Sequence, residues 1–130
     1  MIAYGDITYL KEWAQLLTKV GDYVVANAGI SDFSYGWCGH IAHYSSDSTS
    51  AAIQRVSKKK EKAILIPVLV AQDEMFQIKI IGDGIARIKN NKDKVIYKPD
   101  AILPDTNIVK WIIDITAEQV NKINESKHTP

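Results

Sequence analysis

The chain has 130 residues, with 16 lysines and arginines against 15 aspartates and glutamates, so a single domain close to electroneutrality is expected. Apolar residues make up 46% and charged residues 24%, which is typical of a folded soluble domain and excludes a disordered chain, a collagen-like repeat and a coiled coil. The longest uncharged apolar run, residues 63–71, is about half as long as a membrane-spanning helix, so no membrane span is expected.

Targeting signals and cysteine content bear on the compartment. Asp6 and Glu12 precede any continuous apolar stretch, so the N-terminal residues do not predict a secretory signal. The single cysteine, Cys38, cannot form an intramolecular disulfide, which fits a reducing compartment. We therefore expect a cytoplasmic protein of one domain, residues 1–130, with a frayed polar tail at 125–130.

The first predicted element is an amphipathic helix that begins near Ile7, after the good N-cap residue Asp6. Apolar residues recur at three- and four-residue spacing from Leu10 to Ala28. This unbroken phase favours one long helix over two helices separated at Gly21.

The next segments are a loop, a short ambiguous element and a second helix. The loop is expected at 31–36, and residues 37–44 fit either a strand or a helical turn, of which we favour the strand. The serine-rich run 45–50 supplies several N-caps, so a helix is predicted near 50–62.

The centre of the chain is predicted to be β-structure. Residues 63–71 are aliphatic and rich in branched side chains, as in a strand buried on both faces. Pro67 has no N–H group to donate and therefore points to an edge or a bulge. Alternation and intervening turns predict further strands at 76–80, 85–88, 95–97 and 108–115.

The last predicted strand, 108–115, places four apolar residues on one face, and Trp111 among them is expected in the core. Thr116 and Gln119 have the spacing of a capping box, which predicts a short C-terminal helix ending near Asn124.

Together these elements predict an α+β fold. Sequential strands joined by short turns indicate an antiparallel β-meander of about five strands. An N-terminal helix, the helix near 50–62 and the short C-terminal helix are expected to cover this sheet.

The densest group of reactive side chains consists of Cys38, His40 and His43. These residues suggest a thiolate nucleophile with a histidine base, or two histidines acting as general acid and base in metal-independent RNA cleavage. On a strand, however, His43 would point away from the other two. A free cysteine is also among the most frequently buried residues, so a structural Cys38 is the competing interpretation.

The same segment also contains candidate metal ligands. Cys38, His40 and His43, with Asp47, are residue types that bind zinc, but structural zinc sites generally pair ligands from two separate segments. Only one such segment exists in this sequence. We therefore expect neither a metal nor another cofactor.

A basic stripe is predicted on the second helix, where Arg55, Lys59 and Lys62 share a face. Such a stripe could contact nucleic-acid phosphates. The net charge of +1 disfavours this interpretation, because nucleic-acid-binding domains are usually far more basic. The favoured interpretation is a solvated helix end whose lysines complement the helix dipole.

Aromatic residues gather in and beside the predicted loop, where protein interfaces favour them. They are Phe33, Tyr35, Trp37 and Tyr44. We therefore expect a small soluble protein that binds a macromolecular partner, in its most concrete version an immunity protein or an inhibitor. The alternative is a small hydrolase or ribonuclease that uses His40 and His43, with Cys38 as a further candidate, so enzymatic activity is left open.

Overall fold

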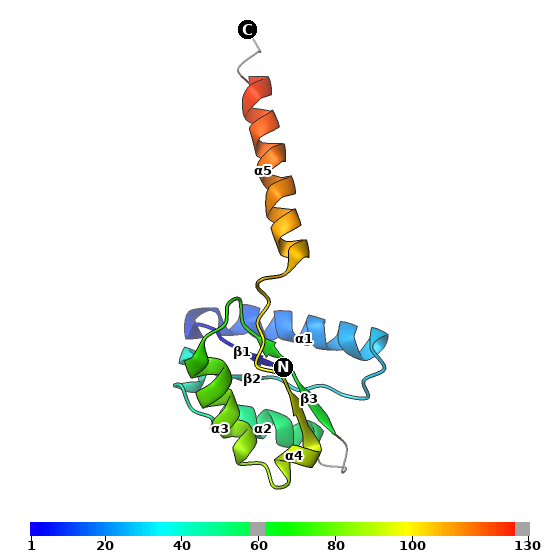
Figure 1. Ribbon diagram of the computed structural model, residues 1–130, viewed down its shortest axis with the longest axis vertical. Helices are drawn as coiled ribbons and strands as arrows, with labels where there is room; N and C mark the ends of the chain where they lie inside the picture. The colour runs from blue at the N-terminus through cyan, green and yellow to red at the C-terminus, as the bar shows by residue number, and fades with distance from the viewer. Residues whose placement is uncertain (58–61, 127–130) are drawn as a thin grey trace.

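Parallel pairing organises the strands of this protein. The structure, a computed structural model, describes residues 1–57 and 62–126. Strands β1 (Ile2–Ala3), β2 (Gly36–Trp37) and β4 (Pro67–Val68) form one sheet in the order β2-β1-β4, and β3 (Ala63–Leu65) pairs with β5 (Val95–Tyr97). Every described strand pair is parallel, and in the view of Figure 1 the strands lie between helix α1 and helices α2 and α3.

The predicted antiparallel meander is therefore wrong, although the α+β composition is correct. Parallel neighbours cannot be joined by tight turns and need a crossover segment of a dozen or more residues. Helices between the strands supply these crossovers, and two of them occupy segments for which strands were predicted.

The N-terminal helix begins as expected. A 3-10 turn, η1 (Ile7–Tyr9), leads into α1 (Leu10–Asn27), and the Asp6 carboxylate accepts a hydrogen bond of 2.8 Å from the backbone N–H of Thr8. The single long helix through Gly21 is confirmed. A Cβ atom at position 21 would lie 2.2 Å from the ring of Phe33, so only glycine allows this close packing.

The segment after α1 is less extended than predicted. Of residues 37–44, which were expected to form a strand, only Trp37 lies in β2, and the 3-10 turn η2 (His40–Ala42) follows. The next helix, α2 (Asp47–Val56), begins earlier than the predicted helix near 50–62 and ends at Val56. The lysines predicted on its last turns at 58–60 lie outside the described residues.

The aliphatic run 63–71 is not one strand. It divides at Ile66, whose carbonyl oxygen accepts a 2.9 Å hydrogen bond from the N–H of Ile2, so β3 and β4 join different sheets. Pro67 begins β4, an edge strand of the β2-β1-β4 sheet, which confirms its expected edge position.

The predicted strands at 76–80 and 85–88 are wrong, because both segments are helical. A π-helical turn, η3 (Met75–Ile80), continues into α3 (Ile81–Ala86). The alternation that suggested a strand is not the pattern of burial, since Ile78 is 51% exposed and Gln77 is buried. The residues turned inward have helical spacing instead, namely Phe76, Ile80, Ile81, Ile85 and Ile88.

The last part of the chain contains one confirmed strand and one wrong one. After the short helix α4 (Asn91–Lys94), the predicted strand 95–97 is present as β5, but it runs parallel to β3. The predicted strand 108–115 lies within one long helix, α5 (Thr106–Ser126). Asp105 caps this helix, since its carboxylate accepts a 2.8 Å hydrogen bond from the N–H of Asn107.

Helix α5 extends away from the body (Figure 1). Trp111 is 61% exposed and not in the core, and the supposed capping residue Thr116 lies inside the helix, where its hydroxyl donates to the carbonyl oxygen of Ile112. Among the described residues, no helix combines the length and apolar character needed to cross a membrane.

The core lies where the two sheets meet α2, η3 and α3. Close packing there is visible at Gly84, where an added Cβ would lie 2.6 Å from Cβ of Thr49 and 3.0 Å from the carbonyl oxygen of Ser46. The buried core residues are Ile2, Cys38, Ala52, Ile53, Ala63, Leu65, Leu69, Ile80, Ile81 and Ile88.

Substitution of two glycines on α3 tests this packing. We expect Gly84→Ala to destabilise the protein by about 1 to 3 kcal/mol, because the added methyl group overpacks the contact with α2. Gly82→Ala is the matched control, since an atom first appears 4.0 Å from its added Cβ, and alanine should stabilise the helix by about 0.5 to 1 kcal/mol. Urea unfolding measures both effects, and midpoints that shift in the same direction would contradict the packing described.

Candidate functional site

Three chain segments meet at the carboxyl ends of the parallel strands. Because β1, β2 and β4 run in the same direction, the residues that follow them emerge at one edge of the sheet. These segments are 4–6 after β1, 38–44 after β2 and 69–76 after β4. In open parallel sheets this edge is where ligands usually bind.

Four rings from these segments form an aromatic cluster, which consists of Tyr4, His40, Tyr44 and Phe76. The ring of Tyr4 lies edge-on to His40 at 5.8 Å and to Phe76 at 5.3 Å between centroids. Tyr44 lies edge-on to His40 at 5.1 Å and stacks on Phe76 at 6.1 Å. Such edge-on and stacked pairs at this spacing add favourable interactions beyond burial.

A hydrogen bond also holds the cluster together. The hydroxyl group of Tyr44 lies 3.0 Å from Nε2 of His40, and the tautomer of the imidazole decides which of the two donates. Both side chains are exposed, Tyr44 to 42%. Gly39 precedes this pair, and a Cβ at that position would lie 2.3 Å from the ring of Tyr4.

The backbone that presents Tyr44 has an uncommon conformation. His43 and Tyr44 have φ values of 49° and 58°, in the left-handed region that side chains with a Cβ rarely adopt. Hydrogen bonds of 3.0 Å from their N–H groups to His40 and Gly39 hold this turn. Such conformations persist where the surrounding structure enforces them, and they are concentrated at functional sites.

Charges near the cluster come from a neighbouring carboxylate. The hydrogen bonds from Thr8 hold the pKa of Asp6 below its usual range, and the nearby charge of His40 adds to this effect. Desolvation, and then the neighbouring Tyr44, raise the pKa of Tyr4. The cluster thus combines the exposed rings of Tyr44 and His40 with the half-buried rings of Tyr4 and Phe76, and an ionised carboxylate lies close by.

Sequence reasoning missed Tyr4, Asp6 and Phe76 as site residues. Their signal is their position just after a parallel strand, and that position is visible only when β1 and β4 are recognised as neighbours of β2. Because the sequence predicted a meander, Phe76 was placed inside a strand and Tyr4 was given no role.

Cys38 lies beneath the cluster and not in it. Its side chain is fully buried, and its thiol donates a 3.6 Å hydrogen bond to the carbonyl oxygen of Ala3. Burial raises the pKa of Cys38 to about 12, so the thiol is protonated at neutral pH. A neutral, inaccessible thiol is typical of a structural residue and does not suit a nucleophile.

His43 and a metal site gain no support from the geometry. His43 is exposed, and in the part of the chain that the structure describes it joins none of the ring contacts made by His40. Within that same part, no three residues among His, Cys, Asp and Glu are arranged to hold a metal ion.

The four aromatic residues predicted to bind a partner make different contacts. Phe33 packs against Gly21 and lines an apolar depression beside α1. Tyr35 and Trp37 contact each other edge-on at 5.7 Å. Of the predicted four, Tyr44 belongs to the aromatic cluster.

Arg55 and Lys62, two residues of the predicted basic face, do not lie on one helix. Arg55 holds the preceding loop, since its guanidinium donates to the hydroxyl of Ser34 at 2.8 Å and to the carbonyl oxygen of Tyr35 at 2.6 Å. Helix α2 ends at Val56, and Lys62 immediately precedes β3. Lys59 lies outside the described residues.

Comparison with known proteins adds no relative. The chain matches no protein-family model, no curated protein and no solved structure. Its function therefore has to be argued from the geometry of the site.

The reactivity of Cys38 tests its structural role. We expect the native protein to react with a thiol reagent at neutral pH far more slowly than the protein unfolded in urea, because the folded thiol is buried and protonated. Quantifying the labelled fraction over time by mass spectrometry measures the difference. Stoichiometric labelling of native protein within minutes would show that Cys38 is exposed and partly ionised.

Proposed function

We propose that the protein acts by binding another protein through the aromatic cluster. The observation that carries this proposal is the exposed pair Tyr44 and His40, which stands at the carboxyl edge of the parallel sheet and is supported by Tyr4 and Phe76. Tyrosine is enriched among the few residues that contribute most of the binding energy at interfaces.

The preorganised turn supports this function. The left-handed backbone at His43 and Tyr44 and the hydrogen bond to His40 fix the ring of Tyr44 before a partner arrives. A side chain that is already ordered loses little conformational entropy on binding, so more of its contact energy contributes to affinity.

A more specific version is an immunity protein or an inhibitor that works in the cytoplasm. The unpaired Cys38 is compatible with a reducing compartment. The small size and the near-neutral charge suit a protein that docks by packing more than by charge attraction.

A second candidate function is a small hydrolase or ribonuclease. It is favoured by one observation, the 3.0 Å hydrogen bond between the Tyr44 hydroxyl and the imidazole of His40, two groups that can transfer protons. In this alternative His40 acts as general acid or base, and Cys38 plays no part because its thiol is buried and protonated.

Tyrosine substitutions test the binding function. We expect Tyr44→Ala to weaken a partner complex by about thirtyfold, since loss of an aromatic anchor commonly costs about 2 kcal/mol. Tyr23→Ala is the matched control, because Tyr23 is an equally large and more exposed tyrosine on α1. Partners captured by the wild-type protein are identified by mass spectrometry, and their affinity for each folded variant is measured by calorimetry.

His40→Gln separates binding from catalysis. Glutamine can still hydrogen-bond to the Tyr44 hydroxyl but cannot carry a proton in a reaction. Binding by packing predicts little change in affinity, whereas catalysis predicts a loss of about a hundredfold in turnover on RNA or acyl esters. The binding function is rejected if Tyr44→Ala retains every partner of the wild-type protein at unchanged affinity.

A further inference from the structure

One face of the β3-β5 sheet is exposed in the part of the chain that the structure describes. The buried side chains Ala63 and Leu65 of β3 face the core, whereas Ile64 of β3 and Ile96 of β5 point the other way and are each 53% exposed. Parallel sheets are almost always covered by helices on both faces. A further apolar helix could therefore pack on this face.

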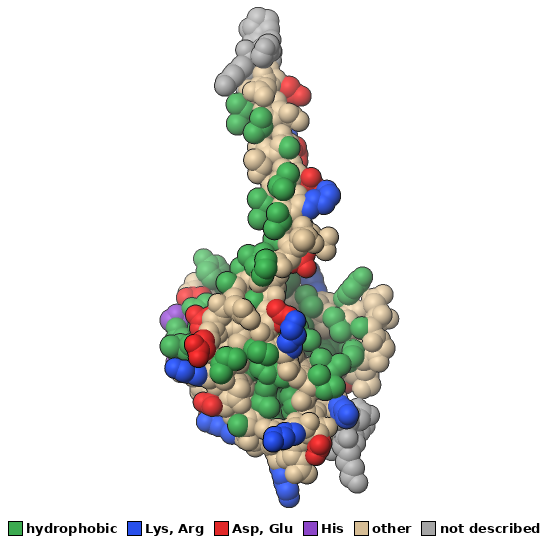
Figure 2. All heavy atoms as spheres, viewed as in Figure 1, with side chains coloured by type: hydrophobic (Ala, Val, Ile, Leu, Met, Phe, Trp, Pro, Cys, Tyr) green, Lys and Arg blue, Asp and Glu red, His purple; other side chains and the backbone are tan. Residues whose placement is uncertain are grey.

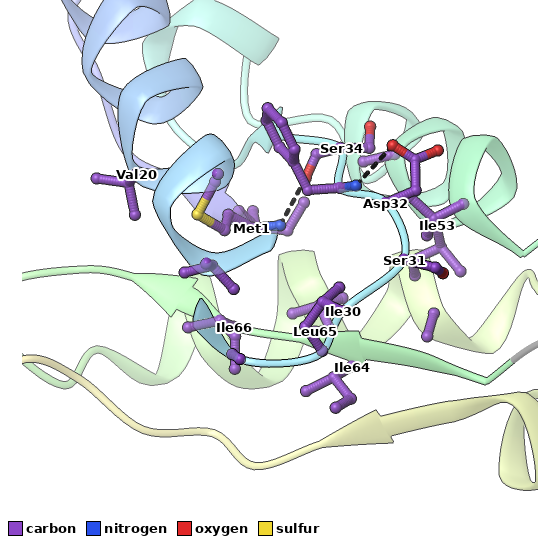
Figure 3. Close-up of a pocket in the computed structure, with 18 of the residues that line it drawn as sticks. Met1, Val20, Ile30, Ser31, Asp32, Ser34, Ile53, Ile64, Leu65 and Ile66 are labelled. Atoms are coloured by element: carbon purple, nitrogen blue, oxygen red, sulfur yellow. Dashed lines mark hydrogen bonds between the residues drawn. The ribbon is translucent and has the colours of Figure 1, made fainter. Parts of the chain in front are cut away.

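The uncovered face continues into two apolar depressions. One, of about 550 Å³, lies between α1 and β3, and Figure 3 shows Val20 on one side of it and Ile64 and Ile66 on the other. The second, of about 380 Å³, shares Ile64 and Ile66 and extends towards β5. We call this surface the β3 groove and define it by Val20, Val24, Ile64, Ile66, Ile96 and Ile102.

Helix α5 carries a matching apolar face. Ile112 lies at its centre, and at about 100° per residue the ion pair Lys110–Asp114 falls on the opposite side, whereas the pair Glu118–Lys122 lies on one flank. Figure 2 shows this division, with hydrophobic side chains along one side of α5 and charged ones along the other. The α5 apolar face comprises Ile108, Val109, Ile112, Ile115 and Val120, with Thr116 and Gln119 among them.

The connection before α5 determines which groove the helix can reach. Hydrogen bonds hold residues 98–103 against the folded body of the same chain. The N–H groups of Ile102 and Leu103 donate to the carbonyl oxygens of Leu69 and Val70. The side-chain amide of the buried Gln77 donates to the carbonyl oxygen of Asp100. Asp105 already caps α5, so only Pro104 separates this cap from the fixed segment. The helix therefore leaves its own body and does not turn back onto its own β3 groove.

A second copy of the chain supplies both surfaces at once. The helix of 21 residues is about 31 Å long and about 10 Å wide, so one helix face and one groove bury on the order of 600 Å². Two reciprocal contacts bury on the order of 1,200 Å², which reaches the range of stable specific interfaces. The Lys110–Asp114 ion pair on the opposite side of α5 stays in water, so this contact buries neither of its charges.

We propose that the protein forms a symmetric homodimer in which α5 of each chain lies in the β3 groove of the other. This exchange gives each parallel sheet the helix that its uncovered face lacks. It covers two exposed apolar surfaces of the chain, the β3 groove and the α5 apolar face, and is independent of the aromatic cluster.

Multi-angle light scattering of the full-length chain tests the dimer. We expect the wild-type protein to have the mass of two chains, and Ile112→Glu on α5 or Ile64→Glu in the groove to halve that mass. Asn121→Glu is the matched control, because it adds the same charge on the opposite side of α5 and should leave the dimer intact. Circular dichroism checks that each variant is folded, and a monomeric wild-type chain or equal dissociation by Ile112→Glu and Asn121→Glu overturns the proposal.

Cross-linking decides how the two chains are joined. Cys38 is the only native cysteine and is buried, so introduced thiols react selectively. We expect a short bis-maleimide to join Ile112→Cys chains to Ile64→Cys chains in a refolded mixture of the two. Cross-linking of Ile112→Cys chains to each other would show that two α5 helices pair. An intrachain link in the monomer of the double variant would show that α5 folds back. Either result overturns the exchange.

Discussion

The fold depends on the burial of two residues, Ile2 and Ala3, as the central strand of the β2-β1-β4 sheet. Their side chains are almost completely inaccessible, and their backbone pairs in parallel with Gly36–Trp37 on one side and Pro67–Val68 on the other. Because both neighbours run in the same direction as β1, each connection has to cross over the sheet through a helix. The same constraint brings Tyr4, His40 and Phe76 to one edge, so the arrangement of the candidate site follows from the strand directions.

Local signals predicted the parts of the chain where the dominant interactions are local. Asp6 caps the first helix as its residue type suggests, and α1 continues through Gly21 because the apolar phase is unbroken. The strand 95–97 and the edge position of Pro67 were also predictable from propensity and from the missing N–H. The direction of each strand could not be predicted in this way, because it depends on which distant segment lies beside it.

The wrong strands share one physical cause. Branched aliphatic residues such as Ile78, Ile80 and Ile113 favour strands by propensity. Tertiary packing overrides this preference at 76–88, where the spacing of the buried residues is helical, whereas in α5 the exposed residues adopt a helix without such packing. Around Gly84 the backbone of α3 approaches Thr49 of α2 closely, and this contact needs a glycine. The sequence pattern there predicts a turn and does not reveal the contact. The same reliance on strand propensity placed Trp111 in the core, where it does not lie. It also left Tyr4 and Phe76 out of the predicted site.

The two surfaces of this protein differ in how their side chains are held, and this difference separates their roles. At the aromatic cluster, Tyr44 is fixed by a hydrogen bond and by a left-handed turn, as expected where a specific geometry is needed. On α5 the exposed apolar side chains follow helical periodicity alone, which is sufficient for packing into a groove. A rigid aromatic edge suits recognition of a particular partner, whereas a long apolar helix beside an uncovered parallel sheet suits completion of the fold by a second copy. Assembly through α5 does not use the carboxyl edge of the β2-β1-β4 sheet. A dimer of this kind therefore presents two copies of the aromatic cluster, one from each chain, to its partners.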